Sequence, residues 1–357
     1  MAYRVTVIPG DGIGPEVIGS TLRVLESLGI SFEWEVAPAG QVALETHGDP
    51  LPPTTVEAMK RNRVTIKGPT ATPVGSGFRS VNVVMRKELE AFANVRPART
   101  LPGIKTRHDA VNIVLIRETL EDLYAGIEAD LGTEEALELR EWLNTRLHAI
   151  VPPDSAFSIK FISRANSERI IDYAFRFARK HRRSKVTAVH KANIMKATDG
   201  LFLEIFRTVA SRYSDVQSED LIVDNASMQL VMRPERFDVL VCPNLYGDIL
   251  SDLCAGLVGG LGIAPGANIG DEYAIFEAVH GTAPDIAGKD LANPTAMFLT
   301  AKMMLDHLGE EAAADCLEKA VLAVLSEGKY VTRDINPLSG VGTSAMTNAV
   351  KENLSRF

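Results

Sequence analysis

The segment VTVIPGDGIGPEVIGSTLRVLESLG at residues 5–29 decides the fold class, because it reads as a buried strand, a glycine-rich turn and a helix in succession. Pro15 stands in the first turn of that helix and Gly29 ends it, as helix termini prefer. Further short, β-branched apolar runs alternate with stretches of helical period, at residues 64–66, 111–116, 184–190, 221–223 and 238–244. This alternation predicts an α/β protein whose sheet is covered by helices.

Length and charge limit the classes of partner. The chain has 357 residues, a length that usually forms about two domains. Hydrophobic residues make up 46% and charged residues 24%, which excludes disordered and collagen-like proteins. The 38 Lys and Arg against 46 Asp and Glu give a net charge of -8, which disfavours binding to polyanions. We therefore expect no nucleic-acid partner and no membrane association.

The cysteines and the first residues indicate a compartment. Cys242, Cys254 and Cys316 are an odd number without a C-x-x-C pair, so we expect free thiols in a reducing environment. The N-terminal residues lack the apolar region of a signal peptide, and no stretch approaches the ~18 apolar residues of a membrane span. We expect a cytoplasmic protein, and a processed organelle protein would share these features.

The glycine-rich turn GDGIGPE at residues 10–16 allows two interpretations. It follows a strand and precedes a helix, and Glu33 and Glu35 lie about twenty residues further on, as in a dinucleotide-binding fingerprint. The glycine spacing is G-x-G-x-G followed by Pro15, however, and differs from the G-x-G-x-x-G of that fingerprint. The spacing favours a tight turn near an active site over a Rossmann nucleotide site.

Two carboxylates in GDILSDLCAG, residues 247–256, are candidate metal ligands. Asp248 and Asp252 are four residues apart and therefore share one side of a helix, where like charges repel. A divalent cation would turn that repulsion into attraction. The alternative is that both carboxylates only interact with the helix dipole.

A basic segment stands out in this acidic chain. Between Arg79 and Arg117 we count eight basic and three acidic residues, a local net charge of +5. Arg117 ends an apolar strand, where a buried cation needs a partner, and a guanidinium suits a carboxylate. A position on the protein surface would explain Arg79, Arg99 and Arg107, but it does not explain Arg117. A second basic run, KHRRSK at residues 180–185, is interpreted as a solvated helix terminus.

Six strings together resemble the metal-dependent β-decarboxylating dehydrogenases of isocitrate, homoisocitrate and 3-isopropylmalate. They cover nearly the whole chain in the order of that family: IPGDGIGPEV (8–17), SVNVVMRKELEAFANVRP (80–97), IRETLEDLYAGIE (116–128), VHKANIMK (189–196), NLYGDILSDL (244–253) and GANIGDEYAIFEAVHGTAPDIAGKDLANPTA (266–296). The resemblance implies a large α/β domain from residues 1–99 and 255–357, a smaller α/β domain over 100–254, and a homodimer with shared active sites. It also implies that the fold is not a Rossmann fold.

The resemblance implies a role for individual residues. Arg86, Arg96 and Arg117 would bind the carboxylates of a tricarboxylate substrate. Mg²⁺ or Mn²⁺ would be held by Asp248, Asp252 and the partner subunit's Asp224. Tyr124 and the partner subunit's Lys191 would be the acid and base. NAD would be bound by Thr72, Asn193, Glu277, His280, Gly281, Ala283, Asp285, Ile286 and Asn293.

Two pairs of residues predict the substrate and the cofactor. Ser80 and Asn82 stand where isopropylmalate enzymes of the family carry apolar residues, and their polar groups suit a third carboxylate. Isocitrate is therefore favoured over 3-isopropylmalate, and homoisocitrate is excluded less firmly, because a methylene contributes only ~1–3 kcal/mol. Asp285 and Ile286 stand where NADP-using relatives carry Lys-Tyr, and a carboxylate there repels a 2′-phosphate, which favours NAD.

The segment 129–156 departs from the short relatives. It predicts a charged amphipathic helix, which we expect in a clasp between subunits and for which we assign no chemistry. The implied activity is the NAD-dependent oxidative decarboxylation of isocitrate, with homoisocitrate or 3-isopropylmalate as alternative substrates. A non-catalytic regulatory subunit is the alternative of another class. It is disfavoured because the residues Tyr124, Lys191, Asp224, Asp248 and Asp252 are all present.

Overall fold

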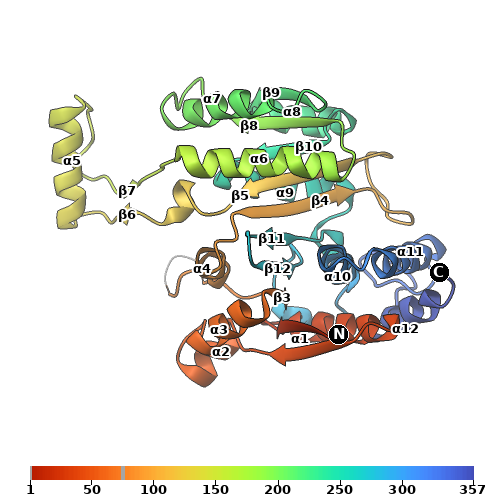
Figure 1. The fold of residues 1–357 in the computed structure, drawn as a ribbon. Coiled ribbons are helices and arrows are strands. Elements are labelled where there is room, and N and C mark those ends of the chain that lie inside the picture. Colours follow the sequence, from red (N-terminus) through yellow and green to blue (C-terminus); the bar gives the residue numbers. More distant parts are fainter. Residues whose placement is uncertain (1, 74–76) are drawn as a thin grey trace.

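One mixed sheet organises the chain in a computed structural model that describes residues 2–73 and 77–357. Within these residues the sheet has ten strands in the order β2-β1-β3-β12-β11-β4-β5-β10-β8-β9, with helices on both faces (Figure 1). The predicted α/β class is confirmed. The strands are β1 (Tyr3–Ile8), β2 (Phe32–Val36), β3 (Val64–Lys67), β4 (Ala93–Arg99), β5 (Asn112–Glu118), β8 (Lys185–His190), β9 (Gln217–Ile222), β10 (Val239–Cys242), β11 (Ala267–Ile269) and β12 (Ala274–Glu277).

The centre of the sheet reverses direction. The pairs β12–β11, β11–β4 and β4–β5 are antiparallel, whereas the strands outside this centre pair in parallel. The half that contains β5, β10 and β8 therefore runs opposite to the half that contains β1, β3 and β12. In each half, the carboxyl ends of the parallel strands meet at one edge, which is where open α/β sheets carry their sites.

The helices cover this sheet on both faces. The predicted helix that starts near Pro15 and ends at Gly29 is present as α1 with a short 3-10 turn after it. The main helices are α1 (Gly14–Leu25), α2 (Gln41–His47), α3 (Pro53–Asn62), α4 (Val81–Glu88), α6 (Arg164–Lys180), α7 (Thr198–Ala210), α8 (Val223–Met232), α9 (Asn244–Val258), α10 (Thr295–Leu308), α11 (Glu311–Glu327) and α12 (Thr343–Leu354). Of the helices in the described part, none has the length and apolar content that a membrane crossing needs.

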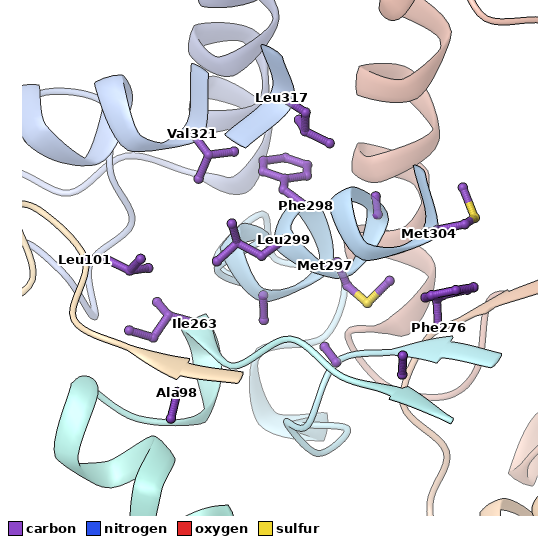
Figure 2. Close-up of a cluster of buried hydrophobic side chains, with 14 of the residues drawn as sticks. Ala98, Leu101, Ile263, Phe276, Met297, Phe298, Leu299, Met304, Leu317 and Val321 are labelled. Atoms are coloured by element: carbon purple, nitrogen blue, oxygen red, sulfur yellow. The ribbon is translucent and has the colours of Figure 1, made fainter. Parts of the chain in front are cut away.

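Two large apolar clusters hold the layers together. One surrounds α10, where Met297 and Phe298 are fully buried and α11 contributes Leu317 and Val321 (Figure 2). The other lies beneath α6, where Phe175 packs in the same cluster as residues of α7. The α10 cluster joins helices from the C-terminal third to strands from both ends of the chain, which explains why residues far apart in sequence form one body.

The two predicted domains contribute strands to one continuous sheet. The boundary between residues 254 and 255 falls inside α9, which runs without interruption from Asn244 to Val258. The boundary after residue 99 coincides with the end of β4. The division into 1–99 with 255–357 and 100–254 stays a prediction, and α9 together with the central strands connects the two parts.

The segment 129–156 forms a projecting arm. A two-stranded ribbon of β6 (Glu128–Ala129) and β7 (Phe157–Ser158) carries helix α5 (Glu134–Arg146) away from the body (Figure 1). The predicted helix is therefore present, but apolar side chains of the arm are exposed: Trp142 on α5 is 52% exposed, and Ile150 in the loop after α5 is 99% exposed. Its place in a clasp between subunits stays a prediction.

The substitution Phe298→Ala tests the α10 cluster. Phe298 is fully buried, so its truncation leaves a cavity, and we expect unfolding to become easier by about 3–5 kcal/mol. The measurement is the denaturant midpoint, with Leu338→Ala as control because Leu338 is 99% exposed. Equal midpoints for the two variants would contradict the role given to Phe298.

Candidate active site

The glycine-rich turn at residues 10–14 brings two other loops together. A side chain on Gly10 would lie 2.1 Å from the carbonyl oxygen of Pro69, and one on Gly12 would lie 2.0 Å from that of Thr282. The amide of Ile13 also donates to the carbonyl of Thr282 at 2.9 Å. The glycines are needed because backbone approaches backbone, and the interpretation as a tight turn near the site is supported.

Glu33 and Glu35, the acidic residues of the possible dinucleotide fingerprint, form contacts with other side chains. Glu33 pairs with Arg4 at 2.8 Å, and Glu35 accepts hydrogen bonds from Arg61 and Asn62. Both carboxylates lie on β2 at the edge of the sheet. Neither is free to bind a ribose, which agrees with the preference for a turn over a Rossmann site.

The three predicted substrate arginines come together across the antiparallel centre of the sheet. Arg86 on α4, Arg96 on β4 and Arg117 on β5 are buried or nearly so. Burial lowers the pKa of Arg96 and also that of Arg117, to about 10, and Arg86 lowers both further by its charge. Three cations this close favour an anionic ligand.

Arg117 depends on the helix that crosses above it. Its Nε donates to Asn244 at 2.9 Å, and it also hydrogen-bonds Asp248. A side chain on Gly247 would lie 2.5 Å from Cγ of Arg117, so only glycine lets α9 pass over the guanidinium. The Nη2 atom of Arg117 is buried and has no hydrogen-bond partner among the described residues, which leaves one donor for a ligand carboxylate.

The two carboxylates of α9 face these arginines. Asp248 accepts from Arg117 and from the hydroxyl of Tyr124, and Asp252 lies 3.4 Å from Arg96. Burial acts to raise the pKa of Asp248, but Arg117 and Tyr124 outweigh it and lower that pKa. Burial raises the pKa of Asp252, which is also close to Asp248. The predicted acid Tyr124, the two predicted metal ligands on α9 and the predicted substrate arginines thus share one site.

A buried carboxylate network supports Arg86. Glu277 at the end of β12 accepts from Lys67 at 2.8 Å and from Arg86 at 3.0 Å. Although burial acts to raise it, the pKa of Glu277 is lowered by Lys67 and Arg86. Asn268 on β11 accepts from Arg86 and also donates to Glu277. The assignment of Glu277 to NAD stays a prediction, and in the structure its carboxylate contacts Lys67, Arg86 and Asn268 at the wall of the pocket described below.

Sequence reasoning missed Lys67, Asn94, Asn244, Ser251 and Asn268. Lys67 ends the apolar run VTIK and is as buried as its neighbours, which is a signal comparable to that of Arg117. The amides and Ser251, which accepts from Arg96 at 2.5 Å, carry no such signal. Their roles follow from strand register, since Asn94 pairs with both Arg117 and Asn268 across the sheet.

A pocket of about 170 Å³ connects substrate and cofactor residues. Its walls include Arg86, Arg96 and Asn82 on one side and His280 and Gly281 on the other. The carboxamide oxygen of Asn82 accepts from Thr70 at 3.1 Å, so its NH₂ group can face a ligand. Ser80 precedes α4, is half-buried and does not line this pocket.

The predicted cofactor residues are only partly brought together. His280 lines the pocket, and its Nε2 is buried without a partner among the described residues, which fits a ligand atom. Burial lowers the pKa of His280 and favours the neutral ring. Asn293 is different, because its amide donates to Asp334 at 2.8 Å and its oxygen accepts from the amide of Thr295. In the structure, the Asn293 side chain therefore stabilises the loop in which it lies.

The remaining cofactor candidates lie on surface loops. Ala283 has a left-handed φ of 37° and precedes the short turn of Asp285 and Ile286. Asp285 is exposed, and Ile286 packs against the α10 cluster. Thr72 is exposed beside the residues 74–76, which lie outside the described part of the chain. Asn193 is also exposed, two residues after Lys191.

The predicted base and the predicted third metal ligand form a separate pair. Lys191 follows β8 and is ion-paired with Asp224 at the start of α8, which lowers the pKa of Asp224. Buried Asp199 accepts from the backbone amide of Lys191 at 2.7 Å and so positions it. In the described part of the chain, neither Lys191 nor Asp224 contacts Asp248, Asp252 or Tyr124 by a hydrogen bond or ion pair.

The described residues of one chain do not complete the predicted metal site. Among the residues that the structure describes, no three His, Cys, Asp or Glu side chains gather as a metal site would need. Asp248 and Asp252 supply two carboxylates one helical turn apart, which fit a hard cation. The assignment of Asp224 to the other subunit's site stays a prediction.

Comparison with known proteins identifies the family of the chain. The family model for isocitrate/isopropylmalate dehydrogenase matches residues 4–350. The chain is 46% identical to a protein of Arabidopsis thaliana named isocitrate dehydrogenase [NAD] catalytic subunit 5, over 98% of this chain and 88% of that protein. It is 45% identical to isocitrate dehydrogenase [NADP] of Thermus thermophilus, over 99% of this chain and 68% of that protein.

A solved structure shares the fold over the whole chain. The crystal structure of isocitrate dehydrogenase from Methylococcus capsulatus matches with a TM-score of 0.92 and 50% identity, covering 99% of both chains. The matched segment of the family model includes all of the arginines and carboxylates described above. This chain belongs to the isocitrate/isopropylmalate dehydrogenase family.

Proposed function

We propose that the chain is a catalytic NAD-dependent isocitrate dehydrogenase, which converts isocitrate to 2-oxoglutarate and CO₂. The observation that carries this proposal is the meeting of three arginines, buried or nearly so, with the carboxylate pair of α9, beside a pocket that Arg86 and Arg96 line. Arginines bind substrate carboxylates in two-pronged contacts, and paired carboxylates bind a divalent cation. A polycarboxylate with a metal-chelating hydroxyl satisfies both groups at once.

The residues of this chain account for binding and orientation. Arg117 retains a free buried donor, and Arg96 lies between Asp248 and Asp252, so a substrate carboxylate and a cation bound here would be neighbours. Such fixed charges orient the substrate before reaction. When bound, the cation would stabilise negative charge on the substrate oxygens and NAD would accept a hydride.

Proton transfer is assigned to Tyr124 and to a lysine. Burial and the hydrogen bond to Asp248 raise the pKa of Tyr124, so its hydroxyl holds a proton that it can give to C3 after CO₂ has left. The hydroxyl at C2 must lose a proton as the hydride leaves. In the proposal, the partner's Lys191 takes that proton through a relay.

Shared sites require self-association, and an apolar patch supports it. On α8 and α9, Met228, Met232 and Ile249 are 49%, 61% and 59% exposed. The patch, which adjoins the helix of Asp248 and Asp252, suits a two-fold interface. We propose a homodimer in which each site combines Tyr124, Asp248 and Asp252 of one subunit with Lys191 and Asp224 of the other. A relative named as a catalytic subunit makes a hetero-oligomer the alternative.

The direct test is a steady-state assay. Purified protein with Mn²⁺ and NAD should form NADH from isocitrate with a higher kcat/KM than from homoisocitrate or 3-isopropylmalate. Preference for 3-isopropylmalate would overturn the substrate assignment. No NADH from any of the three would favour the regulatory class.

A complementation experiment tests the shared sites. We expect dimers of Lys191→Met and dimers of Asp252→Asn each to be inactive, because every site carries one substitution. After the two chains are mixed, unfolded and refolded, half of the dimers are mixed, and each has one intact site. Activity should therefore return to about a quarter of the wild-type value.

Mixing without refolding is the control, because subunits then do not exchange. If each site belonged to one chain, the refolded mixture would stay inactive. That result would overturn the proposed partition of residues.

The substitution Asn82→Leu tests the substrate pocket. Loss of an amide donor to a charged carboxylate costs about 1.5–3 kcal/mol, so kcat/KM for isocitrate should fall about 10- to 150-fold. The same change should improve 3-isopropylmalate relative to isocitrate, because the wall becomes apolar. Asn348→Leu on the exposed face of α12 is the matched control. An unchanged ratio of the two substrates would remove Asn82 from substrate selection.

The double substitution Asp285→Lys and Ile286→Tyr tests the cofactor. A lysine would attract the 2′-phosphate that Asp285 repels, so the ratio of kcat/KM for NADP to that for NAD should rise about tenfold or more. Glu352→Lys, a charge reversal on exposed α12, controls for net charge. If both proteins keep the wild-type ratio, residues other than Asp285 and Ile286 select the cofactor.

A further inference from the structure

A cavity of about 540 Å³ lies on the face of the sheet opposite the candidate active site. Strand β4 shows the relation of the two faces. Asn94 and Arg96 line the 170 Å³ pocket, whereas their neighbours Val95 and Pro97 line the larger cavity. Side chains alternate along a strand, so β4 is a shared wall. The cavity lies between α6 and α10, which Figure 1 shows flanking the central strands.

The floor of the cavity is apolar. Val95, Ala267 and Phe276 are paired across β4, β11 and β12 and form one continuous row. Helix α10 adds Leu299 and Met303. The volume falls within the range of about 300–1,000 Å³ that small-molecule sites occupy.

The walls near the helices are aromatic. On α6 the rings of Phe177 and His181 lie 4.2 Å apart. On the other side, Phe276 and His307 lie 5.5 Å apart. All four side chains line the cavity, which therefore offers flat apolar surfaces from two directions. A planar apolar body fits such walls.

The charged residues around the cavity are mainly cations. Five basic residues line it, namely Arg99, Arg176, Lys180, Arg183 and Lys302, against the two carboxylates of Asp306 and Glu318. Lys302 and Arg99 already pair with those carboxylates, and Arg176 and Arg183 pair with Asp172 and Asp238. Lys180 forms no ion pair with any described residue, and this exposed ammonium is free for a ligand. The basic run KHRRSK, interpreted as a solvated helix terminus, thus lies at the edge of a cavity.

Lys180 contributes to two pKa shifts at the cavity. Burial and Lys180 lower the pKa of His181, and burial and Lys180 also lower the pKa of His307. His181 ends α6 and His307 belongs to α10, so the charge of Lys180 acts on both sides of the cavity. An anion bound there would interact with a cation that no carboxylate neutralises.

We propose that this cavity binds a small organic anion with a planar apolar body, and that its occupancy is coupled to the substrate pocket through β4, β11 and β12. The coupling follows from register. On β4, Asn94 accepts a hydrogen bond from Arg96 and directly precedes Val95 of the cavity floor. On β11, Asn268 accepts a hydrogen bond from Arg86 and directly follows Ala267 of the same floor. A shift of these strands at the cavity therefore moves the supports of the substrate arginines. Binding energy at one site then changes the affinity of the other.

The probe for binding is 8-anilinonaphthalene-1-sulfonate, whose planar naphthalene ring carries one anionic group, and its binding is followed by fluorescence. We expect saturable binding that Lys180→Glu weakens by at least about fivefold, because an attraction becomes a repulsion. Met303→Trp should weaken it as well by filling the cavity. Lys319→Glu is the matched control, since Lys319 is exposed on α11 outside the cavity.

Equal probe affinity in wild type, Lys180→Glu and Lys319→Glu would overturn the proposal, because the probe would then bind elsewhere, for example on α5 or α8. Lys180→Glu alters an exposed side chain, so it keeps the test valid if Met303→Trp does not fold. These binding measurements do not depend on the proposed activity.

The coupling rests on the proposed function and has a separate test. Isocitrate with Mn²⁺ should change the dissociation constant of the probe, and the probe should change that of isocitrate by the same factor. If isocitrate is turned over but leaves the probe affinity unchanged, the coupling is wrong. If isocitrate does not bind at all, the proposed function fails and the binding site for the anion stands on its own data.

Discussion

The candidate site depends on the need to neutralise buried guanidinium groups. Burial lowers the pKa of Arg96 and of Arg117, the charge of Arg86 lowers both further, and a cation in this setting is costly unless it is paired. The carboxylate of Glu277 pairs with Arg86, and the carboxylate of Asp248 pairs with Arg117. The supporting amides and Ser251 fix the directions of the guanidinium planes, so the unsatisfied donor of Arg117 is held ready for a ligand and not lost to local rearrangement.

The same requirement explains the reversal at the centre of the sheet. A fully parallel sheet would place the ends of β5 and β12 at one edge, and their polar residues would meet in a single row. With β4 and β11 antiparallel to their neighbours, Arg117 at the end of β5 pairs in register with Asn94 near the start of β4. Charged residues from both halves of the sheet thereby meet at its middle, where they are buried, instead of at its solvent edge.

Much of this could be predicted from local sequence. Strands β1, β5 and β10 are apolar runs, and Arg117, Asp248 and Asp252 stand out because a charge interrupts an apolar strand or helix. Strand β4, with the sequence ANVRPAR, was not predicted, since arginine and proline break the apolar pattern, and β11 and β12 are only three and four residues long. The roles of Asn94 and Asn268 come from register, which no local pattern encodes.

The basic run at residues 180–185 shows a second limit. Its position at a helix end was predicted correctly, because α6 ends at Lys180. The helix across the cavity from α6 is α10, which lies more than a hundred residues further along the chain. The cavity is formed because these two helices leave β4 and β11 uncovered between them. A local sequence pattern predicts one helix or strand at a time, whereas a cavity depends on how several elements that are distant in sequence are placed in space.

Helix α9 has a consequence for motion. It starts beside β10, carries the two carboxylates over Arg117, and continues to Val258, where Gly259 meets Ile104 and Ile263. No flexible linker therefore separates the halves of the molecule along this path. Any movement of one half of the molecule relative to the other must therefore twist the shared sheet and bend a continuous helix, and both distortions cost free energy.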